Sequence, residues 1–432
     1  GSWTAGYWAK GGSVNGYAFE RTYAYTSQTY LQLWRDTYDN LMDYNVMETN
    51  ANKLNLKFHA AIAKIMKAFN FQLLVDEYGN IPYSEALKGQ GNLQPQYDNQ
   101  ATIYQDLSAK LKAAIADIKA AQLPGSNVVV VTTAEDVMLG ADMNNWIKFA
   151  NNLRLRILMR QSGIPAIVAS TYFTTEMNDL NTSPDGFLLS DVLVQPGYLQ
   201  SQDKQNPWFD RYRADPTGAS STERRYQGPT VFLLKQLVDN NDGRLSRLLS
   251  PPLDPDGNPL PHVGLILGDP NPPLSGNFST WGPGVAKGFS QPSPIMLAAE
   301  TYFLISEARF RGFLTAGITA QAAYESGVKA SFAFFYTPAP TATTATVATL
   351  AQRGLDAYNL YIAQVANPNV SWTAAPDKQK LIIYQKWLAL YSISGIEAWN
   401  EYRRTGYPNF PASLQSTSPR ADKLPVRLLY PT

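Results

Sequence analysis

Two glutamates on one predicted helix form the pair that most resembles an acid–base pair. Glu300 and Glu307 lie in PIMLAAETYFLISEARFRGF, residues 294–313, and share a helix face with large apolar side chains. Glycosidases place two carboxylates roughly 5–9.5 Å apart, whereas seven helical positions span about 10.5 Å along the axis. We therefore interpret the pair as buried charge that needs basic partners, with Arg154 and Arg156 of another predicted helix as first choices.

A second acidic motif imitates a calcium loop. Asp254, Asp256, Gly257 and Asn258 match the opening of such a loop, but Leu265 stands where the bidentate glutamate is required. A β-turn is the better interpretation of this motif. We therefore expect no metal here.

The remaining catalytic residue types are scarce. The chain has no cysteine, which excludes disulfides and thiolate metal sites within these 432 residues. Of its two histidines, His59 falls inside an apolar helical stretch and is best explained as a core residue. No glycine-rich phosphate loop has the strand and helix context that it needs. We expect no catalytic residues and no cofactor.

Aromatic residues in a loop-rich stretch indicate binding instead. Pro, Gly, Asp and Asn dominate residues 183–292, so the aromatic side chains there cannot all belong to a helix core. Flat rings on a stiff loop stack sugars or hold peptides. A turn at residues 76–83 presents two more rings. The predicted ligand-binding residues are Tyr78, Tyr83, Trp208, Phe209, Phe278 and Trp281.

The turn at residues 76–83 must be positioned by the helix before it. From Leu54 to Leu73 apolar residues recur at steps of three and four, which predicts a long helix with one buried stripe. Gly79 and Asn80 allow the chain to turn, and Ile81-Pro82 forces an extended exit. Ser84 followed by Glu85 predicts the start of another helix.

Other periodic segments predict an all-α fold. Helices are expected at about 30–47, 98–121, 135–162, 294–313, 319–336, 346–366 and 376–395, and one short helix at 230–238. Residues 1–29 are expected to be irregular and draped over the surface, and TPAPTATTATVAT to be a flexible spacer. We predict one domain over 1–432, with a helical scaffold at 30–182 and 293–408 and a loop-rich insert at 183–292.

Composition limits the possible partners. Charged residues make up only 16% of the chain and aromatic residues 12%, with 25 Tyr, and the formal net charge is +1. Neither nucleic acid nor an anionic membrane surface is favoured by such a charge. No run of apolar residues is long enough to span a bilayer.

Four stretches together resemble the SusD/RagB family of Bacteroidota, in particular its SusD-like branch. They are AFNFQLLVDEYGNIPYSEALKG with PQYDNQATIYQDL (68–107), DVMLGADMNNWIKFANNLRLRILMR (136–160), AAETYFLISEARFRGF (298–313) and QKWLALYSISGIEAWNEYRRTGYP (385–408), with KLPVRLLYP close behind. They occur in the order found in the family and span nearly the whole chain.

The resemblance implies a non-enzymatic nutrient-binding lipoprotein of the outer membrane. Family members have tetratricopeptide-like helix pairs, are lipid-anchored through an N-terminal cysteine on the extracellular face, and cover a SusC-like, TonB-dependent barrel transporter. Their cargo is oligosaccharide or peptide. This sequence lacks the lipidation cysteine and a final helix, so we expect it to begin downstream of the mature terminus.

Two alternative functions remain open from the sequence. One is a helical glycoside hydrolase that uses paired carboxylates such as Glu300 and Glu307. The other is a tetratricopeptide-like scaffold that binds only protein. Turnover of a glycan that is abolished by one carboxylate substitution would favour the hydrolase. Retention of oligosaccharide without turnover would exclude the scaffold.

Overall fold

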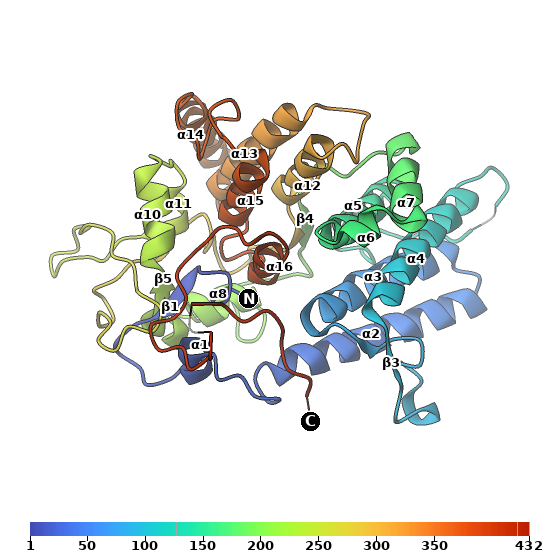
Figure 1. Cartoon of the computed structure of the whole chain (residues 1–432), viewed down its shortest axis with the longest axis horizontal. Helices are drawn as coiled ribbons and strands as arrows, with labels where there is room; N and C mark the ends of the chain where they lie inside the picture. Colours follow the sequence, from blue (N-terminus) through green and yellow to red (C-terminus); the bar gives the residue numbers. More distant parts are fainter. Residues whose placement is uncertain (127, 421, 432) are drawn as a thin grey trace. The chain divides into compact units, whose positions relative to one another are not determined.

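Helices make up most of the regular structure in the computed structural model, which describes residues 1–126, 128–420 and 422–431 (Figure 1). Over these residues the chain forms sixteen α-helices: α1 (Ala18–Thr22), α2 (Leu31–Lys53), α3 (Lys57–Tyr78), α4 (Gln100–Ala121), α5 (Met143–Gln161), α6 (Pro165–Val168), α7 (Thr171–Thr182), α8 (Pro207–Tyr212), α9 (Thr222–Tyr226), α10 (Val231–Asp239), α11 (Leu245–Leu248), α12 (Ala298–Phe310), α13 (Ala320–Tyr336), α14 (Thr344–Ile362), α15 (Lys378–Ala389) and α16 (Gly395–Thr405). The predicted all-α class is confirmed.

The strands are short and antiparallel, and each pairs with a single partner. They are β1 (Trp8–Lys10) with β5 (Gln227–Pro229), β2 (Ile81–Pro82) with β3 (Tyr97–Asp98), β4 (Val192–Val194) with β8 (Ser293–Met296), and β6 (Leu249–Ser250) with β7 (Thr280–Trp281). In the described part of the chain, no helix combines the length and the apolar character that crossing a membrane requires.

Two compact units divide the chain. The first unit comprises Gly1–Ala24, Ser190–Phe310 and Ile318–Pro425, and the second comprises Tyr25–Leu189, Arg311–Gly317 and Val426–Thr432. Each unit therefore joins segments that are distant in sequence. The predicted division into scaffold and insert is a different partition and stays a prediction.

The second unit is organised around α3. This helix packs between α2 and α4 and also contacts α5, so it is buried along most of its length. Gly79 ends it in a positive-φ conformation, and its backbone N–H donates to the carbonyl of Val75. Ile81 and Pro82 then form β2, which is the extended exit that the sequence predicts.

The helix predicted from Ser84 is not formed. The carboxylate of Asp98 accepts hydrogen bonds from the backbone N–H of Tyr83 at 3.1 Å and from that of Ser84 at 2.8 Å, and also from the Ser84 hydroxyl. Asp98 thus holds this segment against β3, and Asn99 is the N-cap of α4. A side chain fourteen residues away decided the local conformation.

Arg154 forms the buried interhelical pair that the sequence predicted, but with other partners. Its guanidinium lies 2.7 Å from both Glu176 and Asp179 of α7. Glu307, one of the expected partners, is instead held by Arg404 of α16 through two contacts of 2.7 and 2.6 Å. The choice of partner depends on helix packing, which residue spacing along one helix does not reveal.

In the first unit, the start of the N-terminal segment is buried, so the expectation that residues 1–29 drape over the surface was wrong for residues 3–11, while residues 12–24 are partly or fully exposed. Residues 3–11 are buried and include strand β1. The Tyr7 hydroxyl donates to the Trp387 carbonyl at 2.5 Å, and the Trp387 indole donates to the Ala5 carbonyl at 2.7 Å. The N-terminal segment is therefore stabilised by α15, a helix that lies 380 residues later in the chain.

Several helix boundaries also differ from the expectation, among them the end of α2 at Lys53 and the start of α12 at Ala298. The predicted spacer contributes to α14, because the Thr343 hydroxyl accepts a hydrogen bond from the N–H of Thr346 and caps the helix. Helix α5 starts only at Met143, where Asp142 is the N-cap. Helix α15 ends at Ala389, earlier than predicted.

Candidate ligand-binding site

The six rings predicted to bind ligand differ sharply in exposure. Trp208 and Tyr83 are partly exposed. The other four are almost fully covered, with exposed fractions of 1% for Tyr78, 6% for Phe209, 2% for Phe278 and 1% for Trp281. The covered rings pack within their own units, and contact of any of the six with a ligand stays a prediction.

Tyr83 in the second unit is already engaged by neighbours. Its hydroxyl donates to Asp106 at 2.6 Å, and Lys110 donates to the hydroxyl and lies 4.6 Å from the ring centroid. Phe71 meets the ring edge-to-face at 4.6 Å. Burial, followed by the hydrogen bond to Asp106, raises the pKa of Tyr83. These contacts orient the ring and leave it little freedom.

An aromatic cluster around Tyr78 was missed by sequence reasoning. Trp34 contacts Tyr78 edge-to-face at 4.8 Å, and Tyr430 contacts Tyr97 at 5.3 Å. Tyr97 is 49% exposed. The sequence places Trp34 in a helix stripe and Tyr97 in a loop, and nothing in it places the chain's last tyrosine beside them.

The first unit contains a cavity of about 510 Å³, a size typical of small-molecule sites. Its apolar lining includes Trp208, Pro292, Pro294, Pro340 and Val347. The cavity is also lined by polar side chains, among them Asp191, Asn206, Lys287, Gln291 and Ser293. An apolar surface with a few polar groups suits a ligand that has both flat faces and hydroxyl groups.

Helix α8 fixes the position of Trp208. Pro207 occupies the first helical position, and the Asn206 side chain caps the helix by accepting from the N–H of Phe209 at 3.0 Å. The Asn206 amide also donates to the carbonyl of Gln291 at 3.0 Å, which ties α8 to the opposite segment of the cavity. Trp208 packs edge-to-face on the buried Trp281 at 5.8 Å.

Charge in the cavity is concentrated at Lys287 and Asp191. The Lys287 ammonium donates to the Phe334 carbonyl at 2.6 Å and lies 3.9 Å from the Phe334 ring centroid. Burial lowers the pKa of Lys287 to about 7, Asp191 opposes this shift and Arg247 adds to it. Burial raises the pKa of Asp191, although the N–H of Ala298 donates to its carboxylate at 2.8 Å. The pair supplies a donor and an acceptor to the lining of the cavity.

The structure shows where the remaining candidate motifs lie. The Asp254 carboxylate accepts from the N–H of Asp256 at 3.0 Å and of Asn258 at 2.8 Å, which is the turn that the sequence predicted. Within the described residues, no three acidic, histidine or cysteine side chains gather where a metal ion would be held. His59 lies on α3, with its ring 3.7 Å from the carboxylate of Glu135.

Comparison with known families decides the identity of the fold. The family model of SusD-like proteins, described as starch-binding and associating with the outer membrane, matches residues 4–431. The chain belongs to the SusD-like family. The predicted resemblance is therefore confirmed, and with it the association of the family with the outer membrane.

Solved structures agree with the SusD-like assignment. A SusD homologue from Bacteroides fragilis NCTC 9343 is 21% identical, with a TM-score of 0.75, covering 100% of this chain and 87% of its own. A chitin-binding SusD homologue from Flavobacterium johnsoniae is 25% identical, with a TM-score of 0.73, covering 96% and 82%. A third structure, a chitin-binding protein, is 24% identical, with a TM-score of 0.74, covering 100% and 86%. No curated protein matches the chain.

Proposed function

We propose that this SusD-like chain binds oligosaccharides at the extracellular face of the outer membrane and passes them to a SusC-like, TonB-dependent barrel transporter. The observation that carries the binding step is the partly exposed Trp208 ring on the wall of the cavity. The family description as starch-binding and the chitin-binding structural neighbours support a glycan as the cargo.

The cavity supplies the interactions that a sugar needs. The Trp208 ring is held by Trp281 and by the capped start of α8, so it loses little freedom when a sugar face stacks on it. Lys287 uses one ammonium hydrogen on Phe334 and has others for sugar hydroxyls, while Asp191 accepts hydrogen bonds. We infer that one face of the sugar stacks on Trp208, while the sugar hydroxyl groups accept a hydrogen bond from Lys287 and donate one to Asp191.

We also infer that binding occurs without turnover. Glu307, one of the two glutamates considered for glycoside hydrolysis, is only 1% exposed. Arg404 and Gln379 occupy its carboxylate, with contacts of 2.7 and 2.8 Å to the same oxygen. A buried carboxylate that is occupied by these partners is poorly placed to contact a glycosidic bond.

Anchoring and delivery are inferred from the family. We propose an N-terminal lipid anchor outside this sequence and a lasting complex with the barrel transporter. Such a complex should bury well over ~2,000 Å². Purification from native membranes tests both, because the barrel should be retained at moderate salt and a lipid-modified N-terminal peptide should be found by mass spectrometry.

Substitution of Trp208 tests the binding site. Trp208→Ala should weaken binding of starch- or chitin-derived oligosaccharides about 2- to 12-fold, which corresponds to a ring interaction of ~0.5–1.5 kcal/mol. The measurement is isothermal titration calorimetry on purified protein, alone and with the transporter. Trp372→Ala is the matched control, because Trp372 is also partly exposed in the first unit but does not line the cavity.

Equal affinities of wild-type protein and Trp208→Ala would exclude this cavity as the glycan site. Binding of peptides but of no oligosaccharide would contradict the glycan cargo.

A further inference from the structure

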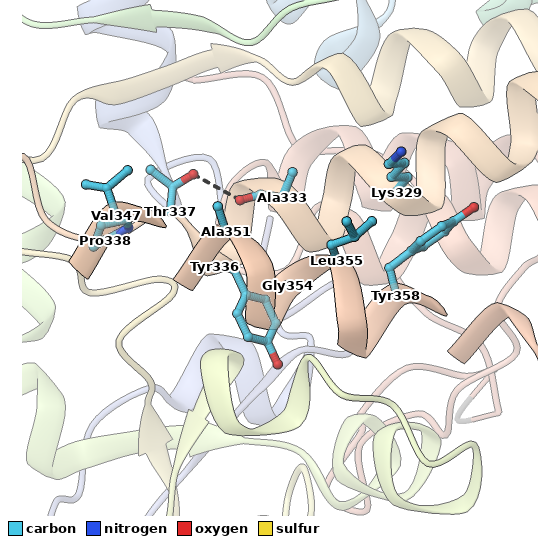
Figure 2. A pocket seen from close by; sticks show the side chains of 10 residues that line it. All are labelled: Lys329, Ala333, Tyr336, Thr337, Pro338, Val347, Ala351, Gly354, Leu355 and Tyr358. Atoms are coloured by element: carbon cyan, nitrogen blue, oxygen red, sulfur yellow. Dashed lines mark hydrogen bonds between the residues drawn. The ribbon is translucent and has the colours of Figure 1, made fainter. Parts of the chain in front are cut away.

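A second groove lies beside the Trp208 cavity, between α13 and α14. Its volume is about 320 Å³, and Figure 2 shows its lining. Thr337, Pro338 and Val347 line both this groove and the cavity. Thr337 is exposed, Pro338 is partly exposed and Val347 is 44% exposed, so these residues form an accessible ridge. A ligand that leaves the cavity across this ridge enters the groove.

The groove exists because the two helices meet at small residues. A Cβ atom at Gly354 would lie 2.8 Å from the Cβ of Tyr336, so only glycine permits this close approach of α14 to α13. Ala333 and Ala351 line the groove and leave its middle open. The floor is therefore narrow and apolar, and it is wide enough for small groups only.

One end of the groove is polar. Figure 2 shows Lys329 and Tyr358 at the end opposite the ridge. Lys329 is exposed, and neither it nor the Tyr358 hydroxyl forms a hydrogen bond or ion pair with any described residue. Burial, assisted by Glu325, raises the pKa of Tyr358, so its hydroxyl keeps its proton. Two hydrogen-bond donors are thus available for a ligand.

We propose that this groove is a second subsite, which holds the acylated far end of an oligosaccharide whose near end occupies the Trp208 cavity. An acetyl group combines a methyl group with a carbonyl acceptor, and the groove combines an apolar floor with two donors. This inference rests on the proposed function and adds two features to it. The ligand is longer than the cavity, and its sugars are N- or O-acetylated.

Oligosaccharides that differ only in acylation test the subsite. Oligomers of β-1,4-linked N-acetylglucosamine and of β-1,4-linked glucose share a backbone, and only the first carries acetamido groups. Affinity is measured for both series from the disaccharide to the hexasaccharide. The proposal predicts that affinity rises with length more steeply in the N-acetylated series.

Substitutions in the groove give the decisive comparison. Ala351→Phe fills the groove from an exposed helical position and should reduce the affinity for the N-acetylated hexasaccharide about tenfold, while the disaccharide binds as to wild-type protein. Tyr358→Phe removes one donor and should reduce the affinity for the N-acetylated hexasaccharide about 2- to 12-fold. Thr349→Phe is the matched control, because position 349 is exposed on the same helix but does not line the groove.

The outcomes separate this inference from the function on which it rests. Unchanged hexasaccharide affinity in both Ala351→Phe and Tyr358→Phe, with short oligosaccharides still bound at Trp208, would overturn the subsite alone. Equal affinities of the two sugar series would overturn the acyl recognition. Failure of wild-type protein to bind any oligosaccharide would overturn the proposed function and the subsite together. Thermal melts of each variant establish that it is folded.

Discussion

At the scale of single residues, the cavity contains a lysine in an unusual environment. Lys287 lies against the Phe334 ring and donates to the Phe334 carbonyl, and Asp191 is the acidic residue that favours its charged form. Burial nevertheless outweighs Asp191, because the ammonium loses most of its hydration. The charged form of Lys287 is therefore destabilised in the free protein. Such an environment is expected where a bound ligand supplies the hydrogen bonds that water no longer makes.

Lys287 should make stability depend on pH. Burial lowers the pKa of Lys287 to about 7, from the ordinary value of 10.5, so the folded protein releases this proton at a lower pH than the unfolded chain does. Between these two values the unfolded state binds more protons, and the free energy of unfolding therefore rises with pH. Lys287→Met should remove up to about 1.4 kcal/mol per pH unit from that slope.

Urea unfolding at a series of pH values from neutral to alkaline measures this slope. Lys329→Met serves as the control, because Lys329 is exposed. Identical slopes for wild-type protein and Lys287→Met would show that Lys287 is as well solvated when folded as when unfolded.

At the scale of elements, buried charge ties the C-terminal helices of the first unit together. Lys386 of α15 lies 2.8 Å from Glu397 and 2.9 Å from Glu401, both on α16. Arg404 of α16 reaches across to Glu307 of α12. Burial lowers the pKa of Arg404, but Glu307 and Glu401 outweigh it and raise the pKa overall. The network fixes the relative register of three helices, because each charge has a specific partner.

Removing Arg404 should be costly. Arg404→Ala leaves Glu307 buried without its bidentate partner and should lower the free energy of unfolding by about 3–5 kcal/mol. Lys235→Ala breaks an exposed pair with Asp239 and should cost at most ~1 kcal/mol. Chemical denaturation of both variants gives the comparison, and equal losses would contradict a structural role for the buried network.

At the scale of the whole molecule, the first unit depends on contacts between its N-terminal segment and segments that are distant in sequence. Strand β1 pairs with β5, and the ring of Tyr7 stacks on that of Trp387 at 5.0 Å. The indole of Trp8 donates to the Ser392 hydroxyl at 3.1 Å. The N-terminal segment is therefore part of the core that supports α15.

Tyr7→Phe tests this dependence with a minimal change. The variant keeps the ring but removes one of the donors to the Trp387 carbonyl, which also accepts from the N–H of Leu390 at 3.2 Å, so the free energy of unfolding should fall by about 0.5–1.5 kcal/mol. Tyr97→Phe is the control, because Tyr97 is half-exposed and water can replace its contacts. A stability of Tyr7→Phe within error of wild type would mean that this hydrogen bond is dispensable.

The sequence alone predicted those features that depend on neighbours along the chain. The long helix α3, its end at Gly79 and the turn at Asp254 follow from local periodicity and local hydrogen bonding, and each was found, although α3 starts at Lys57 and leaves Leu54 outside it and exposed. The family was also predictable, because four stretches in a fixed order are a property of sequence. The segment from Ser84 was mispredicted because Asp98, which holds it, is not a local neighbour.

Only the tertiary structure decided which rings are covered and which charges meet. Phe209, Phe278 and Trp281 occur in a loop-rich stretch, yet they are buried, while Trp208 stays partly exposed. The Trp281 ring, for example, packs against Trp8 of β1 and Trp208 of α8. Arg404 reaches Glu307 from 97 positions away. Burial and pairing depend on packing between segments that are distant in sequence, and no spacing along the chain contains that information.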